Sequence, residues 1–329
     1  MPQAIRLLNL GPTDSWRTQA VYHALAETMT ADSPDTIIVC RPLSAYLCLG
    51  YHQIYEAVLD RAECERRGLP VFRRRVGGGA TYLDADQLFY QCVFHHSRLP
   101  LLFREVYARI LAAPVAALRC LGLKADLRAV NEIEANGRRI AGVGGGRIGQ
   151  ACVVVGNLLF DFDYETMARV WRAPWPSFRE LAASALRERV TTLRRLIGEV
   201  SVEAVQEMLL EEFAEALGRP LESGRLSRAE ADRARQVAKR LASAEYLGLH
   251  AENGRTGPMR SLKISAGVHI RAAEAEVNGH RLRASFRLRD DVIEAVRLES
   301  EPAAEWAQAE AALRGAPFKE WRQHLDEDR

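Results

Sequence analysis

The chain has 329 residues, of which 48% are hydrophobic and 27% are charged, which is typical of a globular protein with one large domain or a large and a small one. Its 45 Lys and Arg against 43 Asp and Glu leave a net charge of +2, which argues against a general nucleic-acid binder. No apolar run approaches the roughly 20 residues that span a bilayer, the start lacks a secretory signal, and the six scattered cysteines indicate reduced thiols. We therefore expect a cytoplasmic protein that acts neither on nucleic acid nor in a membrane.

The first half of the chain alternates helical and strand patterns. Helices are predicted from residue 16 to 28, over 54–67 and over 102–122 with an interruption at Pro114. Strands are predicted at 36–40, 46–50, 88–94, 127–134, 138–142 and 152–160, with Asn136-Gly137 as a hairpin turn. This mixture, with mostly antiparallel strands, predicts an α+β fold.

The remainder of the chain is helical and then becomes strand-like. Residues 163–243 carry helical patterns, with long charged helices at 179–196, 202–217 and 226–243. After a linker at 252–257, residues 281–289 alternate as a strand with Asn278-Gly279 as a turn before them, 292–298 supply a partner strand, and 303–313 form a helix. We predict two domains, residues 1–247 and a small α+β domain at 256–329.

Two glycine clusters are the most informative segments. Gly77-Gly78-Gly79 follows three arginines between two strands, and exposed amides beside guanidinium groups suit phosphate or carboxylate oxygens; a flexible basic hairpin is the alternative. Residues 142–149 formally contain the dinucleotide pattern G-x-G-x-x-G, but the sequel is strand-like rather than helical, so we reject a dinucleotide site. We expect residues 142–149 to form a second mobile loop rich in amides.

In this order the two clusters resemble the lipoate–protein ligase A family, within the biotin/lipoate A/B protein ligase superfamily. The resemblance rests on Arg73-Arg-x-x-Gly-Gly-Gly-Ala80-x-Tyr82-x-Asp84 and, some fifty residues later, on Asn131-Glu-Ile before Gly137-Arg-Arg-Ile-Ala-Gly142. Residues 47–53, 156–161, 189–193 and 262–270 are similar to further family segments, the last in its accessory domain. The resemblance implies a mixed sheet flanked by helices, as in class II biotin/lipoate ligases, with a C-terminal accessory domain.

The resemblance also implies an activity. Lipoate or octanoate would react with ATP, assisted by Mg²⁺, to form an acyl-adenylate, and the acyl group would pass to a lysine of a lipoyl-carrier protein. Arg139 would serve as the catalytic cation. The substrate and ATP would be bound by the positions that match the family motifs, namely Arg74, Gly77, Gly78, Gly79, Ala80, Tyr82, Asn131, Gly142 and Gly144.

The chain departs from the family pattern at three positions. Arg139 stands where the family has lysine, Val76 where it has Ser or Thr, and Leu83 where it has His. Arginine keeps a positive charge and adds a planar fork, but it cannot give up a proton. The sequence therefore leaves two possibilities open, an active ligase and a non-catalytic relative that binds a lipoyl group.

Two further residues carry alternatives. Cys152 is the candidate nucleophile for a thioester route, as in the related octanoyltransferases, although its apolar strand favours a buried core thiol. Asp161 and Asp163 could hold Mg²⁺ on one face of a strand end, whereas capping of the next helix by Asp163 is the simpler account.

Overall fold

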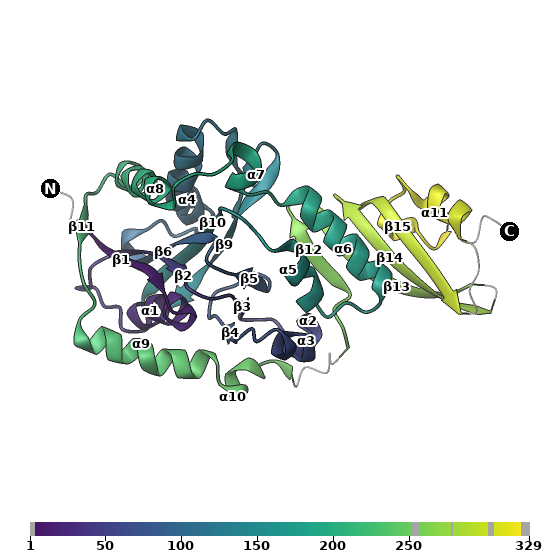
Figure 1. Ribbon diagram of the computed structural model, residues 1–329, viewed down its shortest axis with the longest axis horizontal. Helices are drawn as coiled ribbons and strands as arrows, with labels where there is room; N and C mark the ends of the chain where they lie inside the picture. The colour runs from purple at the N-terminus through teal and green to yellow at the C-terminus, as the bar shows by residue number, and fades with distance from the viewer. Residues whose placement is uncertain (1–3, 252–256, 278, 302–305, 324–329) are drawn as a thin grey trace. The chain divides into compact units, whose positions relative to one another are not determined.

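The computed structural model describes residues 4–251, 257–277, 279–301 and 306–323, and the chain divides into two compact units (Figure 1). The larger unit comprises residues 1–55, 62–163 and 191–254, and the smaller comprises 56–61, 164–190 and 255–329. Residues 164–190, which the sequence analysis placed in the first domain, thus group with the C-terminal part. Most of the expected linker, residues 252–256, lies outside the described residues.

An eight-stranded mixed sheet forms the centre of the larger unit. Its strand order is β11-β1-β2-β6-β10-β9-β8-β7, with parallel pairs at β11-β1-β2 and antiparallel pairs beyond. The strands are β1 (Ile5–Thr13), β2 (Thr36–Pro42), β6 (Gln87–His95), β7 (Ala125–Arg128), β8 (Glu132–Ala135), β9 (Arg138–Ile148), β10 (Ala151–Leu159) and β11 (Leu221–Ser223). The single strand expected over 127–134 is two strands, and β1 and β11 were not predicted.

Helices cover both faces of this sheet (Figure 1). α1 (Ser15–Glu27) and α9 (Arg228–Leu241) share one buried cluster with the sheet, and α4 (Phe103–Cys120) and α8 (Val202–Leu217) share another on the opposite face. α4 continues through Pro114, whose side chain is buried. The expected interruption is therefore wrong, because burial of the helix outweighs one missing backbone hydrogen bond. No helix of the described residues is long and apolar enough to cross a bilayer.

A three-stranded sheet, β4-β3-β5, also belongs to the larger unit. It contains β3 (Tyr46–Leu49), β4 (Val71–Arg73) and β5 (Thr81–Leu83). Residues 74–80 between β4 and β5 carry the first glycine cluster and form a loop, as predicted. The remaining short segments are η1 (His96–Arg98), α3 (Arg61–Arg66), α7 (Leu193–Ile197) and α10 (Ala244–Leu247).

The second glycine cluster is not the expected mobile loop. β9 runs unbroken through it and pairs residue for residue with β10, from Ala141 opposite Leu158 to Ile148 opposite Ala151. The strand persists because glycine leaves room for close neighbours: a Cβ on Gly145 would lie 2.6 Å from the Tyr107 hydroxyl and 2.9 Å from the Val153 carbonyl oxygen.

The smaller unit is built on an antiparallel sheet, β12-β13-β14-β15. Its elements are α2 (Tyr55–Val58), α5 (Tyr164–Val170), α6 (Pro176–Arg189), β12 (Ser261–Ser265), β13 (Val268–Val277), β14 (His280–Arg289), β15 (Val292–Glu301), α11 (Ala307–Leu313) and η3 (Phe318–Glu320). Trp175 Nε1 donates to Ser285 Oγ at 2.5 Å, which ties the start of α6 to β14. Two short helices, α2 and α3, replace the single helix expected over 54–67, and Asn278 of the expected turn lies outside the described residues.

Candidate active site

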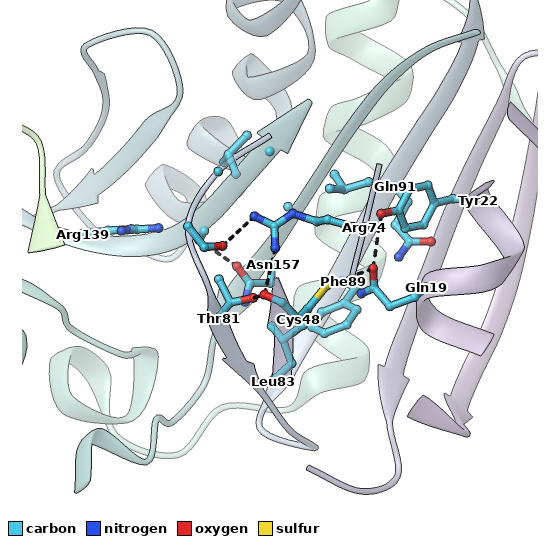
Figure 2. Close-up of a pocket in the computed structure, with 17 residues that line it drawn as sticks. Gln19, Tyr22, Cys48, Arg74, Thr81, Leu83, Phe89, Gln91, Arg139 and Asn157 are labelled. Carbon is cyan, nitrogen blue, oxygen red and sulfur yellow. Dashed lines mark hydrogen bonds between the residues drawn. The ribbon is translucent and has the colours of Figure 1, made fainter. Parts of the chain in front are cut away.

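A pocket lies in the larger unit, on the face of the eight-stranded sheet that α1 covers (Figure 2). It holds about 580 Å³ of empty space, part of which is open solvent. Its floor comes from paired positions of three neighbouring strands, which share one face because directly opposed residues of an antiparallel pair point the same way. The lining residues on these strands are Phe89, Gln91, Gly142, Gly144, Val155 and Asn157.

The first glycine loop forms one wall and is organised by Arg74. The Arg74 guanidinium donates to the carbonyl oxygens of Gly77 at 2.9 Å, Gly79 at 2.8 Å and Cys48 at 3.1 Å. Gly78 adopts a φ of +103°, which only glycine tolerates at low free energy. Of the expected binding residues on this loop, Arg74, Gly78 and Gly79 line the pocket, and the hydrogen bonds of Arg74 hold the loop in shape.

The second glycine segment belongs to the floor of the pocket and contacts the first glycine loop. Gly77 N donates to Gly145 O at 3.4 Å, and a Cβ on Gly144 would lie 3.1 Å from Gly77 O. A Cβ on Gly142 would lie 2.8 Å from Asn157 Oδ1, the acceptor of the Gly142 backbone N–H. The two clusters are therefore neighbours, and Gly142 and Gly144 give the pocket its space.

Arg139 reaches this pocket from the beginning of β9, and in Figure 2 it lies at one end of the residues drawn. Its Nε donates to Ala141 O at 3.2 Å, and one Nη lies 3.6 Å from the place of a Cβ on Gly142. Burial lowers the pKa of its guanidinium, and the buried Glu132 carboxylate opposes that shift. The pocket thus contains a positive charge next to bare glycine backbone.

A chain of hydrogen bonds connects the second glycine segment to Asp84. The Asn157 side chain accepts from Gly142 N at 2.7 Å and donates to Gln87, whose own amide donates to Asp84 at 3.2 Å. Burial raises the pKa of the Asp84 carboxyl to about 6. Asp84 belongs to the motif quoted above, and Asn157 lies in the family-like segment 156–161, but neither Asn157 nor Gln87 was named as a site residue. Both are polar amides within apolar strands.

The other end of the pocket is polar, which the sequence analysis did not anticipate. Gln19 and Tyr22 on α1 and Gln91 on β6 lie together there, away from Arg139 (Figure 2). All three side chains are at most 5% exposed. A glutamine inside the run Leu88-Phe-Tyr-Gln-Cys-Val-Phe94 was the available signal, because a strand core seldom contains an amide without a partner.

Four of the expected binding residues do not line the pocket. Gly77 contributes its carbonyl to Arg74, and Ala80 is a partly buried loop residue before β5. Tyr82 points away because its β5 neighbours Thr81 and Leu83 take the pocket side; its ring packs edge-on against another aromatic, Phe162, at 6.2 Å. Asn131 Nδ2 donates to the Val143 carbonyl at 3.4 Å.

The alternative nucleophile and the candidate metal ligand also lie elsewhere. Cys152 is 3% exposed within the cluster on the α4 side of the sheet, and burial raises its thiol pKa to about 11. Asp161 forms an ion pair with Arg194 and accepts from Phe162 N. Among the described residues no group of three or more His, Cys, Asp or Glu could hold a metal ion. The structure thus favours a core thiol at 152 and lends no support to magnesium at Asp161.

Comparisons with known proteins agree with this fold. The family model for the lipoyl protein ligase A/B catalytic domain matches residues 14–214. The chain is 28% identical over 270 residues to the octanoyltransferase LipM of Kyrpidia tusciae (74% of this chain, 98% of that protein) and 26% identical over 207 residues to lipoate-protein ligase A subunit 1 of Thermoplasma acidophilum (60% and 78%). A solved bipartite lipoate protein ligase from T. acidophilum, studied with its E2 lipoyl domain, has a TM-score of 0.69 at 24% identity, over 75% of this chain and 97% of that one. The predicted mixed α+β fold is confirmed.

Proposed function

Because the chain belongs to the lipoyl protein ligase A/B catalytic domain family, we propose that it is an ATP-dependent lipoate–protein ligase. It joins lipoate, or a related medium-chain acid, to a lysine of a lipoyl-carrier domain. The relatives' names cover two chemistries, ligation and octanoyl transfer. Ligation and octanoyl transfer need different catalytic side chains, so the residues that line the pocket favour one reaction over the other.

Transfer through a thioester requires a nucleophilic thiolate at the acyl group. Cys152 lies on the other face of the sheet, and burial keeps its thiol protonated. Cys48 is the cysteine among the pocket-lining residues, but burial raises its thiol pKa as well and its Sγ donates to Gln19 Oε1 at 3.6 Å. Neither thiol is prepared to attack, which favours the ligase.

Ligation through an acyl-adenylate requires positive charge where the carboxylate meets the α-phosphate. The observation that carries the proposal is the Arg139 guanidinium in the pocket, beside the unsubstituted backbone of Gly142. Arg139 binds the carboxylate and then offsets the negative charge that gathers on the α-phosphate. The exposed backbone of Gly78 and Gly79 faces the same space and suits the phosphate oxygens of ATP.

The reaction proceeds in two balanced steps. A carboxylate oxygen attacks the α-phosphorus of Mg-ATP, forms the mixed anhydride and releases pyrophosphate. The neutral amine of the carrier lysine then attacks the acyl carbonyl, forms an amide, loses a proton and releases AMP. Arg139 keeps its proton throughout, which fits an electrostatic role and excludes a role as general base.

The test combines two assays. With lipoate, Mg-ATP and a lipoyl domain, we expect pyrophosphate release and a lipoyl mass gain on one carrier lysine. With octanoyl-loaded acyl carrier and no ATP, we expect no transfer. ATP-independent transfer that disappears in C48A or C152A would contradict the proposal, and so would lipoate binding without pyrophosphate release, the mark of a non-catalytic relative.

A further inference from the structure

The polar end of the pocket contains a buried hydrogen-bond acceptor that nothing satisfies. Gln91 is 2% exposed, and its Oε1 accepts no hydrogen bond from any of the described residues. A buried amide oxygen without a donor loses its hydration and gains nothing in return, so such atoms are rare in folded proteins. Because Gln91 lines the pocket, a bound molecule can supply the missing donor.

The orientation of the Gln91 amide is fixed by its other contact. Its Nε2 donates to the backbone carbonyl of Thr18 at 2.6 Å. A flipped amide would place its oxygen against that carbonyl oxygen, two acceptors in contact. The atom left without a partner is therefore the acceptor, and the ligand group facing it must be a donor.

The neighbouring donors already have acceptors. The Tyr22 hydroxyl donates to Gln19 Oε1 at 3.2 Å, and the Cys48 thiol donates to the same oxygen. Gln19 Nε2 in turn donates to Tyr46 at 2.7 Å. Burial raises the pKa of the Tyr22 hydroxyl, so it stays protonated. This network holds the groups around Gln91 in place without satisfying its oxygen.

We infer that the pocket selects a medium-chain carboxylic acid that carries a hydrogen-bond donor, a hydroxyl or a thiol, at its far end. This inference rests on the proposed function for the direction of the acid, with its carboxylate at Arg139 and its tail toward Gln91. The middle of the pocket, lined by Leu83, Phe89 and Val155, suits the methylene chain. Octanoate would place a methyl group against Gln91 Oε1, and the disulfide ring of lipoate has no donor, whereas the dithiol of dihydrolipoate has two.

The first experiment uses calorimetry, without ATP, to measure how tightly the wild-type protein binds four acids. They are octanoate, 8-hydroxyoctanoate, lipoate and dihydrolipoate. We expect 8-hydroxyoctanoate to bind at least about tenfold more tightly than octanoate, since a good hydrogen bond to a buried acceptor is worth roughly that factor. Dihydrolipoate should bind several-fold more tightly than lipoate, a smaller ratio because a thiol is a weaker donor. Equal or tighter binding of octanoate would overturn the inference, and so would the absence of binding by all four acids.

Two variants test whether Gln91 is the source of the preference for 8-hydroxyoctanoate. Q91M keeps a similar length but removes the acceptor, so we expect the preference for 8-hydroxyoctanoate to fall to about unity. L83M changes an apolar lining residue of the same pocket and should alter both affinities alike. A preference that survives in Q91M overturns the inference. Should Q91M not fold, the wild-type ratios decide alone.

The same acids separate this inference from the proposed function. Acyl-adenylate formation with equal kcat/KM for octanoate and 8-hydroxyoctanoate would leave the ligase standing and overturn the donor requirement. Selective binding of 8-hydroxyoctanoate with no pyrophosphate release would support the donor requirement and contradict the ligase. The two statements therefore fail on different measurements.

Discussion

At the scale of single residues, the proposed function depends most directly on Arg139. The resemblance implies lysine at this position, and the structure places a guanidinium in the pocket instead. We expect R139Q to lower the rate of acyl-adenylate formation by about 100-fold or more, because a preorganised charge at a developing anion contributes about that much. R139K keeps the charge and should stay within about tenfold of wild type. Single-turnover release of pyrophosphate measures both.

Arg138 provides the control for this series. It precedes Arg139 on the same strand and is exposed outside the pocket, so R138Q should leave the rate unchanged. An R139Q rate within a few-fold of R138Q would show that the guanidinium at 139 does not act on the reacting groups.

Asp84 makes stability depend on pH. Burial raises the pKa of its carboxyl to about 6, above the ordinary value of 3.8. Between these values the native state binds this proton more tightly than the unfolded state, so its contribution to the free energy of unfolding falls as pH rises from 4 to 6. D84N removes the titration, and its stability relative to wild type should therefore improve from pH 4 to pH 6.5, as measured by urea unfolding.

Asp32 supplies a matched substitution, since D32N removes an exposed carboxylate that does not line the pocket. Its difference from wild type should change little over the same range. A D84N difference that is equally flat would show that the Asp84 carboxyl titrates normally.

At the scale of elements, the two glycine triplets show how far sequence reasoning reaches. Gly77-Gly78-Gly79 is a loop, as predicted, whereas Gly144-Gly145-Gly146 lies within β9. The local signal is the same in both, and glycine weakens a strand wherever it stands. What differs is long-range: β10 pairs along the second triplet, the Tyr107 hydroxyl lies too close to Gly145 for a side chain, and the Gly77 carbonyl crowds Gly144. Those neighbours come from distant parts of the chain, so the pattern around the triplet did not disclose them.

Adjacent glycines of β9 should respond oppositely to alanine. On Gly145 a Cβ would meet the Tyr107 hydroxyl at 2.6 Å and the Val153 carbonyl at 2.9 Å, so we expect G145A to lower the free energy of unfolding by about 2 kcal/mol or more. On Gly146 the nearest atom is 3.7 Å away, an ordinary contact, and G146A should be neutral or slightly stabilising. Chemical denaturation compares them, and equal losses would mean that crowding at Gly145 is not the cause.

At the scale of the whole molecule, the sequence pattern did not indicate that residues 164–190 group with the C-terminal part of the chain. The periodicity of residues 176–189 identifies an amphipathic helix but does not say which sheet it covers. In the structure α6 packs in the smaller unit, where Ser177 contacts Ser285 at 2.9 Å. The amide side chains of the pocket were hidden for a similar reason, because Gln19, Gln91 and Asn157 come from three separate elements. The motifs contain Arg74, Arg139 and glycines that line the pocket, whereas only tertiary packing brings the amides of its inner end to the same place.

Each unit has its own buried core, so we expect calorimetry to resolve two thermal transitions. Ser285 is fully buried and is the acceptor for Trp175 Nε1, so S285A leaves that donor without its partner. We expect it to destabilise the smaller unit by about 1–3 kcal/mol and to lower only that unit's transition, by several degrees. S261A makes the same change at an exposed position of β12 and should shift neither transition. Ser177 of α6 is hydrogen-bonded to Ser285, so the same substitution also reports on the unit to which α6 belongs. If S285A lowered the transition of the larger unit instead, α6 would belong to the first domain, as the sequence analysis predicted.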